Sequence, residues 1–454
     1  MTLPLYAYQK RAVNHYARFN GRVLNADVMG LGKSPPTVVY CRWNDEWPVV
    51  VVCPASVRTH WVREFRKFAD VRAVELEGTS PPTWREFSAY PRERAYVISY
   101  DVLKEWMPVL RRVGPKVVVL DECQMLQSRG TRRTRQARRL CRGVGKVIAL
   151  SGTPLTIRPA ELWPTLNLLW PDEFPSFFTF AHKHCGPRKR PWGWEFKGAV
   201  RVPLLNKTLK ACGMIRRRKE DVLKDLPPKT RYTVQVPLAD PDEYREAEEE
   251  FLKWLAKTHG RSKARRAAAV EKLVKVGYML RLTGRLKRPA VQTWVEKFRD
   301  RAAGKLITFG YHKHMVRGLY EKFPGSVIID GSVTGKARQR AVDRFTRVKA
   351  CRLLFGNMIA AGTGWNGTAA NDVAMTELYW KPGVLAQAED RPHRVGQTGE
   401  VRVWYLIARG TVEEELADLI DRRQKVVEGV LDGAPRDDMS LVNEWLDTLL
   451  EKRR

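Results

Sequence analysis

The chain has 454 residues, of which 44% are hydrophobic, so it is long enough to bury the cores of two domains of ordinary size. Its 81 lysines and arginines outnumber its 50 acidic residues by 31, which predicts a surface that attracts polyanions, with nucleic acid as the leading partner and a merely solvated basic surface as the alternative. This composition excludes a disordered tail, and no run of ~20 apolar residues predicts a membrane span.

Short β-branched runs recur between longer helical-looking stretches, a pattern typical of parallel sheets with crossover helices. In the first half the runs lie at 49–53, 95–99, 116–120 and 146–150, after a weaker run at 22–26. A second series lies at 305–309, 326–330, 352–355, 372–376 and 401–407. Two separate series predict an α/β protein with two lobes.

Three other stretches differ in composition. Residues 158–235 are rich in Pro, Trp and Phe, which indicates an irregular, partly helical insertion. Residues 240–285 predict one or two long helices, acidic at first and basic afterwards, with either a solvated or a DNA-facing surface. Residues 411–454 predict an amphipathic helix that packs back on the body.

The segment Gly30-Leu31-Gly32-Lys33-Ser34 fits a phosphate-binding loop between the first strand and a helix. Glycines let backbone N–H groups turn toward phosphates, the helix N-terminus adds a positive dipole end, and Lys33 supplies a point charge. Ser34 is the predicted Mg²⁺ ligand. Because such a loop also occurs by chance, the prediction needs a second element.

That element is the apolar run 116–120 followed by Asp121 and Glu122. A buried strand that ends in two carboxylates can deliver them to a metal and a water, although an acidic turn is the simpler alternative. We predict that Asp121 binds Mg²⁺ and that Glu122 orients or deprotonates the attacking water. Ahead of the loop, Tyr8 and Gln9 are predicted ATP contacts, because the Gln9 amide can pair with an adenine edge.

Several motifs in order resemble the Swi/Snf-type ATPases of helicase superfamily 2. They span residues 27–34, 121–124, 150–155, 214–219 and 387–397. Within that group the chain looks most like the annealing-helicase (HARP-like) branch, because of 177–194 with its PWGW and of 309–313. The similarity extends from Tyr8 to about residue 425.

The resemblance implies two RecA-like lobes and a set of roles. Lobe 1 is predicted at 1–157 and binds ATP, 158–290 holds an insertion and helical protrusions, lobe 2 lies at 291–425, and 426–454 is a C-terminal helix. Arg391 and Arg394 of lobe 2 are predicted arginine fingers, so that hydrolysis depends on lobe closure. The predicted coupling residues are Gln124, Ser151, Gly152, Thr153 and Gln387. Gly364 is a predicted ATP contact, and Thr363 is a predicted contact of a DNA phosphate.

Three positions depart from the family pattern. Val28 stands where the family usually has Glu, Gln124 where it usually has His, and Trp365 where it usually has Leu. None removes a catalytic charge. Since the position of Gln124 normally contacts the coupling motif, the departure bears on the coupling of hydrolysis to DNA.

Residues 129–146 carry eight basic residues and no acid, on the helix that lies beside the DNA path in relatives. We predict DNA contact there rather than a merely solvated helix. The predicted DNA contacts are Arg58, His60, Arg132, Arg133, Arg135, Thr363 and Trp380. Trp380 has a packing role as its alternative.

These features predict an ATP- and Mg²⁺-dependent translocase on double-stranded DNA that remodels or anneals it. A strand-separating DNA or RNA helicase is one alternative, and a catalytically dead DNA-binding scaffold is another. Seven scattered cysteines without a CxxC pair are typical of a reducing compartment. We expect a monomer without a membrane or obligate protein partner or an N-terminal targeting domain, cytoplasmic if prokaryotic or viral and nuclear if eukaryotic.

Overall fold

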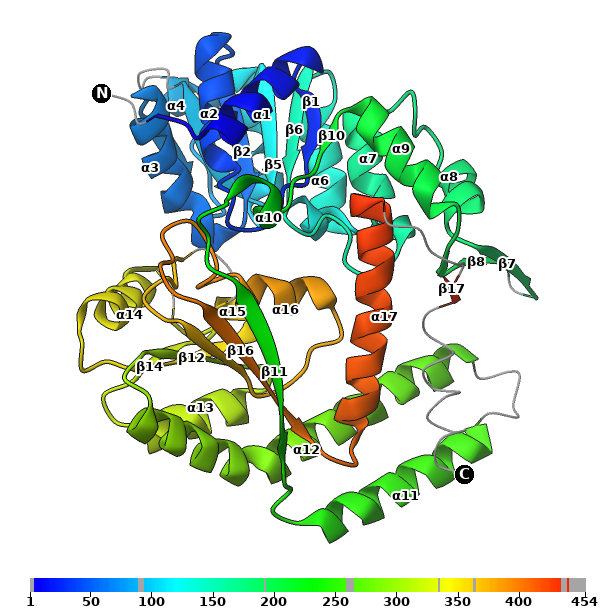
Figure 1. Cartoon of the computed structure of the whole chain (residues 1–454). Coiled ribbons are helices and arrows are strands. Elements are labelled where there is room, and N and C mark those ends of the chain that lie inside the picture. Colours follow the sequence, from blue (N-terminus) through cyan, green and yellow to red (C-terminus); the bar gives the residue numbers. More distant parts are fainter. Residues whose placement is uncertain are drawn as a thin grey trace. The chain divides into compact units, whose positions relative to one another are not determined.

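The computed structural model divides into two compact units, each with its own parallel sheet (Figure 1). The first unit comprises Met1–Asp225 and Arg423–Leu441, and the second is built on Leu226–Arg422. The structure describes residues 4–88, 94–191, 193–258, 265–333, 335–361, 365–433 and 439–440. Among these residues, no helix has the length and apolar content needed to cross a bilayer.

The first unit contains a seven-stranded sheet in which every neighbouring pair is parallel. In spatial order its strands are β10 (Met214–Ile215), β1 (Arg22–Asn25), β6 (Lys146–Leu150), β5 (Val117–Asp121), β2 (Val49–Cys53), β4 (Ala95–Ser99) and β3 (Ala73–Leu76). The central strands are continuous apolar runs because helices cover both faces of the sheet. Alternate residues of one strand therefore enter different cores: Val50 and Val52 pack in one, Val49 and Val51 in the other.

The second unit contains a six-stranded sheet, again parallel throughout. Its order is β11 (Lys229–Val236), β16 (Val401–Ala408), β15 (Asp372–Met375), β12 (Leu306–Gly310), β14 (Leu353–Asn357) and β13 (Val327–Ile329). The same alternation holds here, with Ile307 and Phe309 in one core and Leu306 in the other. The predicted α/β class with two RecA-like lobes is confirmed.

Helices connect the strands in both units. Those of the first unit are α1 (Ala7–Arg18), α2 (Ser34–Trp43), α3 (Arg58–Ala69), α4 (Trp84–Ser88), α5 (Leu103–Val113), α6 (Arg132–Cys141), α7 (Trp163–Leu169), α8 (Phe177–His184), α9 (Val202–Cys212) and α10 (Lys219–Val222). Those that begin in the second are α11 (Pro241–Thr258), α12 (Arg265–Arg301), α13 (Lys313–Lys322), α14 (Gly335–Arg347), α15 (Met358–Ala361), α16 (Pro382–Glu389) and α17 (Val412–Asp432). Of the one or two long helices expected within 240–285, the structure has two, α11 and α12, and α12 continues beyond that range to Arg301.

The segment expected to be an irregular insertion, 158–235, holds more strand than its composition suggested. Two edge strands come from it: β10 pairs with β1 in the first sheet, and β11 pairs with β16 in the second. A hairpin of β7 (Pro187–Arg190) and β8 (Gly193–Phe196) follows α8 (Figure 1). A short antiparallel pair joins β9 (Gly198–Ala199) to β17 (Met439–Ser440). These strands were not predicted. Some of them pair with a strand that is distant in the sequence, and the others have four residues or fewer.

Candidate nucleotide and nucleic-acid site

The carboxyl ends of β1, β5 and β6 carry the sequence motifs to one edge of the first sheet. Parallel strands place these ends together, and ligands of such sheets bind there. The loop after β1 reaches Ser34, where α2 begins with Pro35 and Pro36 in its first turn. Gly30 and Gly32 have φ angles of 89° and 66°, a left-handed conformation that glycine tolerates best. The local sequence thus produces a tight loop that ends at a helix N-terminus.

Two residues of α1 hold this loop in shape. The Tyr8 hydroxyl donates to the Leu31 carbonyl at 2.8 Å, and Gln9 Nε2 donates to the carbonyls of Leu31 and Gly32, each at 3.2 Å. The other end of the Gln9 amide accepts from the Tyr6 N–H at 3.1 Å. Tyr8 and Gln9 therefore lie at the phosphate loop, as their predicted role requires, while an adenine contact of Gln9 stays a prediction.

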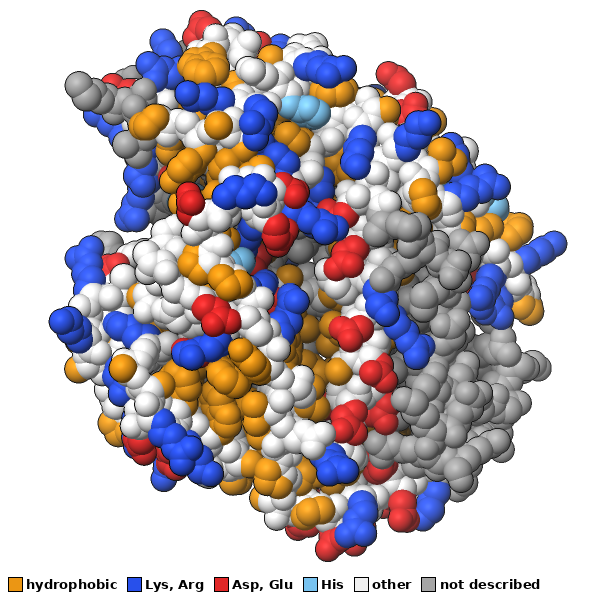
Figure 2. All heavy atoms as spheres, in the orientation of Figure 1, with side chains coloured by type: hydrophobic (Ala, Val, Ile, Leu, Met, Phe, Trp, Pro, Cys, Tyr) orange, Lys and Arg blue, Asp and Glu red, His pale blue; other side chains and the backbone are white. Residues whose placement is uncertain are grey.

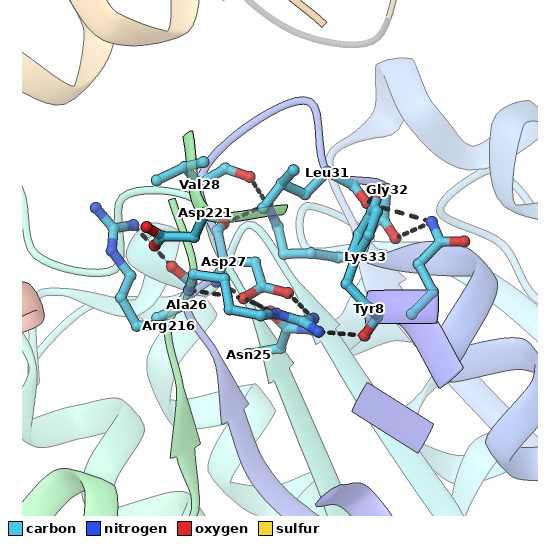
Figure 3. Close-up of polar contacts among 12 residues, drawn as sticks. Tyr8, Asn25, Ala26, Asp27, Val28, Leu31, Gly32, Lys33, Arg216 and Asp221 are labelled. Carbon is cyan, nitrogen blue, oxygen red and sulfur yellow. Dashed lines mark hydrogen bonds and ion pairs between the residues drawn. The ribbon is translucent and has the colours of Figure 1, made fainter. Parts of the chain in front are cut away.

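Lys33 points back toward the end of β1 (Figure 3). Its Nζ donates to the Asp27 carbonyl at 2.9 Å and to the Val28 carbonyl at 3.4 Å. Burial lowers the pKa of Lys33, and the negative charges of Glu122, Asp27 and Asp121 act in the opposite direction. The loop lysine and the two carboxylates of the Asp-Glu motif therefore share one electrostatic environment.

Asp121 and Glu122 are held firmly at the end of β5. The Asp121 carboxylate accepts from Trp61 Nε1 at 2.8 Å and from the Glu122 N–H at 3.0 Å. Burial and the neighbouring Glu122 raise the pKa of Asp121. Glu122 adopts a left-handed backbone conformation with φ of 52°, which is uncommon outside glycine and is found often at functional sites.

The donor chemistry at this edge suits a magnesium ion. Mg²⁺ prefers oxygen ligands and is usually held by one or two carboxylates together with substrate phosphates. The raised pKa of Asp121 marks a buried carboxyl group whose ionised form a cation would favour. The Ser34 hydroxyl, on the first residue of α2, offers a second oxygen. The residues present thus fit the predicted set of Ser34 and Asp121.

A chain of hydrogen bonds leads from Glu122 to the loop after β6. Gln124 Nε2 donates to Glu122 Oε2 at 2.6 Å, and the Ser151 hydroxyl donates to Gln124 Oε1 at 2.6 Å. The Ser151 hydroxyl oxygen then accepts from the Thr153 N–H at 2.9 Å. The amide that departs from the family histidine therefore makes both contacts, which places Gln124, Ser151 and Thr153 in one connected unit.

Gly152, between Ser151 and Thr153, lies directly against the residue before the phosphate loop. A Cβ at Gly152 would come within 2.3 Å of Met29 Cγ and 3.1 Å of the Met29 nitrogen. Only a glycine allows this approach without displacement of Met29. The loops after β1 and β6 are thus in contact.

Two arginines of the segment after β10, Arg216 and Arg217, bind the residues that lead into the phosphate loop. Arg217 forms a bidentate pair with the buried Asp27: its Nε donates to Oδ1 at 3.0 Å, and its Nη2 donates to Oδ2. The Arg217 backbone N–H donates to the same Oδ1 at 3.0 Å, and the guanidinium also donates to the Tyr8 carbonyl. Asp27 is 2% exposed, so its charge depends on this partner.

Arg216 connects the same loop to the end of α17. Its Nη1 donates to the carbonyls of Ala26 at 2.7 Å and Gly152 at 3.0 Å, and its Nε donates to Asp432 Oδ1 at 2.9 Å. The loops after β1 and β6 are therefore joined by one guanidinium. The signal in the sequence was three consecutive arginines, but nothing local showed which carboxylates they pair with.

In the second unit, the predicted arginine fingers lie just after α16. Arg391 is 6% exposed and donates from Nη1 to the Trp365 carbonyl at 3.0 Å and from Nε to the Gln387 carbonyl at 3.3 Å. Arg394 Nη1 donates to the same Trp365 carbonyl at 3.4 Å. Gln387, Arg391 and Arg394 are thus brought together. Thr363 and Gly364 lie outside the described residues.

A buried carboxylate, Glu389, anchors this region and was not predicted. It is 1% exposed and accepts from Lys229 Nζ at 2.8 Å, from Arg231 at 2.7 Å and from the Tyr405 hydroxyl at 2.6 Å. Burial by itself raises the pKa of Glu389, but the charges and hydrogen bonds of Lys229 and Arg231 outweigh burial and lower the pKa to about 2. The end of α16 is thereby fixed to the edge strand β11.

The predicted DNA contacts of the first unit fall into two groups. Helix α6 buries Ala137 and Leu140 and presents Arg132, Arg133 and Arg135 outward. Arg132 pairs with Glu105, and Arg133 Nε donates to Asp101 at 3.0 Å, so both reach acids at α5. On α3, His60 is exposed, whereas Arg58 lies 2.8 Å from Glu77. In the second unit, Trp380 is 41% exposed.

Comparison with known families agrees with this arrangement of a phosphate loop, an Asp-Glu strand and a second parallel-sheet unit. The SNF2-related domain matches residues 8–281, and the helicase conserved C-terminal domain matches residues 281–396. The chain belongs to the SNF2-related family of helicase-like proteins.

Two individual proteins of known name are similar to nearly the whole chain. The chain is 30% identical over 444 residues to the DNA annealing helicase and endonuclease ZRANB3 of Mus musculus, which covers 94% of this chain and 41% of that protein. It is 31% identical over 430 residues to the SWI/SNF-related matrix-associated actin-dependent regulator of chromatin subfamily A-like protein 1 of Bos taurus, covering 93% of this chain and 44% of that protein. The chain thus spans less than half the length of either relative.

Among solved structures, a Sulfolobus solfataricus SWI2/SNF2 ATPase core in complex with dsDNA aligns with a TM-score of 0.45 and 24% identity, over 95% of this chain and 94% of that one.

Proposed function

We propose that the chain is a DNA-stimulated ATPase that uses hydrolysis to move along double-stranded DNA and to remodel or anneal it. The observation that carries the proposal is the shared environment of Lys33, Asp121 and Glu122 at the carboxyl edge of the first sheet. A scaffold without catalysis has no need of a buried lysine on which the charges of two carboxylates act. The names of the relatives, which include a DNA annealing helicase, support the choice of DNA.

The roles of the residues follow from their positions. The backbone N–H groups from Gly30 to Ser34 and the Lys33 ammonium bind phosphate oxygens, and Glu122 orients the attacking water. Asp121 and Ser34 hold Mg²⁺, which when bound neutralises charge on the phosphates. Gln124 positions Glu122 through one hydrogen bond and binds Ser151 through another. It thereby links the end of β5, where hydrolysis takes place, to the loop after β6.

The arginines of the second unit complete the proposed site. Arg391 and Arg394 stabilise charge on the transferred phosphoryl group when the two units close, because a guanidinium is planar and always charged. This dependence on closure makes hydrolysis a motor step. Substitution Arg394→Ala should lower DNA-stimulated turnover roughly 1000-fold while ATP still binds, and unchanged turnover would remove Arg394 from the mechanism.

The main test compares Lys33→Ala with the wild type and with Lys10→Ala, an exposed lysine on α1. ATP turnover is measured without nucleic acid and with duplex DNA, single-stranded DNA or RNA. We expect Lys33→Ala to lose turnover by on the order of 100-fold or more and to keep DNA binding, and Lys10→Ala to behave as the wild type. Turnover in Lys33→Ala equal to the wild type contradicts the proposal. Stimulation by single strands or RNA in place of duplex DNA identifies a strand-separating helicase instead.

A further inference from the structure

The β7–β8 hairpin and the neighbouring helix α8 carry a group of aromatic side chains that the nucleotide site does not use. In the hairpin, Lys189 is opposite Trp194 and Pro187 is opposite Phe196. Residues that are directly opposite in an antiparallel pair lie on the same face, so Lys189, Trp194 and Phe196 share one face. The other face carries Arg188 and Arg190 opposite Glu195 and Gly193.

The aromatic face is continuous with α8. The His182 ring lies 4.7 Å from the Trp194 ring and 5.0 Å from the Phe196 ring, and Phe178 lies 5.9 Å from Phe196, measured between ring centroids. Trp194 is 48% exposed and Phe178 is 56% exposed. Because large aromatic side chains gathered on a surface mark binding sites in soluble proteins, this face is suited to a partner with flat apolar groups.

The charges around this face are almost all positive. Between residues 177 and 201 the only acid is Glu195, which already pairs with Arg190 at 3.2 Å and with Lys197. The exposed lysines and arginines of the stretch are Lys183, Arg188, Lys189, Lys197 and Arg201. Figure 2 shows basic and hydrophobic side chains next to one another over β7 and β8. A partner with negative charges therefore fits this surface better than an apolar peptide does.

The aromatic face also reaches the basic segment 129–146, which contains α6. The Arg129 guanidinium lies over the Phe177 ring, 3.7 Å from its centroid, and Phe177 contacts Phe196 at 5.7 Å. Farther along, Arg138 of α6 lies 5.5 Å from the centroid of Trp163, which contacts Phe177 in turn. The surface on which we propose DNA contact thus continues into the hairpin.

We propose that the β7–β8 hairpin and α8 form a site for unpaired nucleotides of DNA, in which Trp194 and Phe178 stack on bases and Lys189, on the same face as Trp194, binds phosphate. Unpaired bases expose flat faces on a chain of phosphates, which is the chemistry that interleaved aromatic and basic side chains recognise. Bases within a duplex offer no such faces. The inference rests on the proposed action on DNA and adds a binding site beside the duplex path.

The test measures the affinity of the full chain for single-stranded oligo-dT, and ATP turnover with a blunt duplex or the same duplex bearing an unpaired tail. One stacked base contributes roughly 1–3 kcal/mol, so Trp194→Ala should weaken oligo-dT binding about tenfold and lower the ratio of tail-stimulated to blunt-stimulated turnover. Trp194→Phe should restore most of both, and Lys189→Ala should reduce the salt slope of oligo-dT binding by ~1. The matched control is Trp43→Ala, another exposed tryptophan of the first unit, at 62% exposure.

The outcomes separate this inference from the proposed function. If Trp194→Ala leaves both the oligo-dT affinity and the turnover ratio unchanged, or lowers blunt-duplex turnover by the same factor, the single-strand site is wrong while the duplex ATPase stands. If no DNA stimulates the wild type, the proposed function itself fails. An affinity for acidic peptides that exceeds the affinity for oligo-dT would overturn the inference in favour of a protein partner.

Discussion

The phosphate loop of the first unit and the arginine region of the second are stabilised in the same way. Each has one buried carboxylate, Asp27 or Glu389, whose basic partners lie far away in the sequence. In both cases the partners come from the segment that includes the edge strands β10 and β11. A single stretch of about twenty residues therefore supports the functional loops of both units.

The two regions differ in how the charge is shared. Asp27 depends on one residue, Arg217, which also reaches the carbonyl of Tyr8. Glu389 accepts from Lys229, Arg231 and Tyr405, and its pKa is lowered to about 2. We therefore expect loss of the Asp27 pair to change the shape of the phosphate loop, whereas loss of the Glu389 contacts mainly lowers the stability of the second unit.

The largest expected effect is that of Glu389→Ala. It leaves Arg231 and the Tyr405 hydroxyl without their shared acceptor and leaves Lys229 with Asp390 alone, and breaking a buried pair costs about 3–5 kcal/mol. We expect urea unfolding of the second unit at correspondingly lower concentration, with Glu243→Ala, a partly exposed acid of α11, as the control. A loss below about 1 kcal/mol would contradict the role of Glu389.

The same pair predicts a pH dependence. The pKa of Glu389 falls from an ordinary 4.5 to about 2 in the folded chain, so its stabilisation is present above pH 4.5 and is lost as the pH falls toward 2. A shift of this size corresponds to about 3 kcal/mol. Wild type and Glu389→Gln, compared by unfolding across this pH range, should therefore converge at the acid end. If the free energies of unfolding of wild type and Glu389→Gln instead differ by the same amount at every pH, the Glu389 carboxylate is not held ionised.

Next in size is Arg217→Ala, which leaves Asp27 buried without its guanidinium. We expect a loss of about 3 kcal/mol in the free energy of unfolding of the first unit and, unlike for Glu389→Ala, a raised KM for ATP. Arg217→Lys should recover only part of this, since an ammonium cannot form the bidentate pair. The neighbouring Arg218, half-exposed and 3.6 Å from Asp432, provides the control Arg218→Ala. If Arg217→Ala keeps the wild-type KM for ATP, then Asp27 affects stability alone, as Glu389 does, and the proposed difference between the two carboxylates is wrong.

A smaller and more specific effect is expected for Gln124→Leu. The change keeps the approximate size of the side chain but removes both hydrogen bonds, which leaves Glu122 and Ser151 without this bridge. A hydrogen bond to a charged group contributes about 1.5–3 kcal/mol, so DNA-stimulated ATP turnover should fall at least tenfold. Gln124→His should retain turnover, because an imidazole donates with one nitrogen and accepts with the other. Equal turnover in Gln124→Leu and wild type would exclude the bridge from catalysis.

The smallest effect is expected where Gly152 approaches Met29. Gly152→Ala places a methyl group against the Met29 side chain and should cost about 1–3 kcal/mol of stability. Met29→Ala provides room, so the double variant should be less destabilised than the sum of the two single changes. Additive losses in thermal unfolding would show that the two loops are not coupled through this contact.

Much of the candidate site could be predicted because its residues are contiguous in the sequence. The phosphate loop, the Asp121-Glu122 pair and the loop after β6 each come directly after a short apolar run. The runs predicted at 49–53, 95–99 and 146–150 match β2, β4 and β6. The pairing of Gln124 with Ser151 was anticipated only in outline. The pairing of Arg217 with Asp27 and of Lys229 with Glu389 could not be predicted, since nothing local distinguishes these cations among 81 lysines and arginines.

The sequence by itself determined the two parallel sheets, since apolar runs of strand length admit few other structures, and it indicated the loops for which we propose phosphate and magnesium binding. Tertiary structure alone decided that 214–236 contributes an edge strand to each sheet, and that Phe177 of α8 lies between the aromatic hairpin and Arg129 of the basic segment 129–146. The physical reason is the distance along the chain over which each interaction acts. Periodicity and turn chemistry act over a few neighbouring residues, whereas edge pairing and buried ion pairs depend on segments that meet only when the chain has folded.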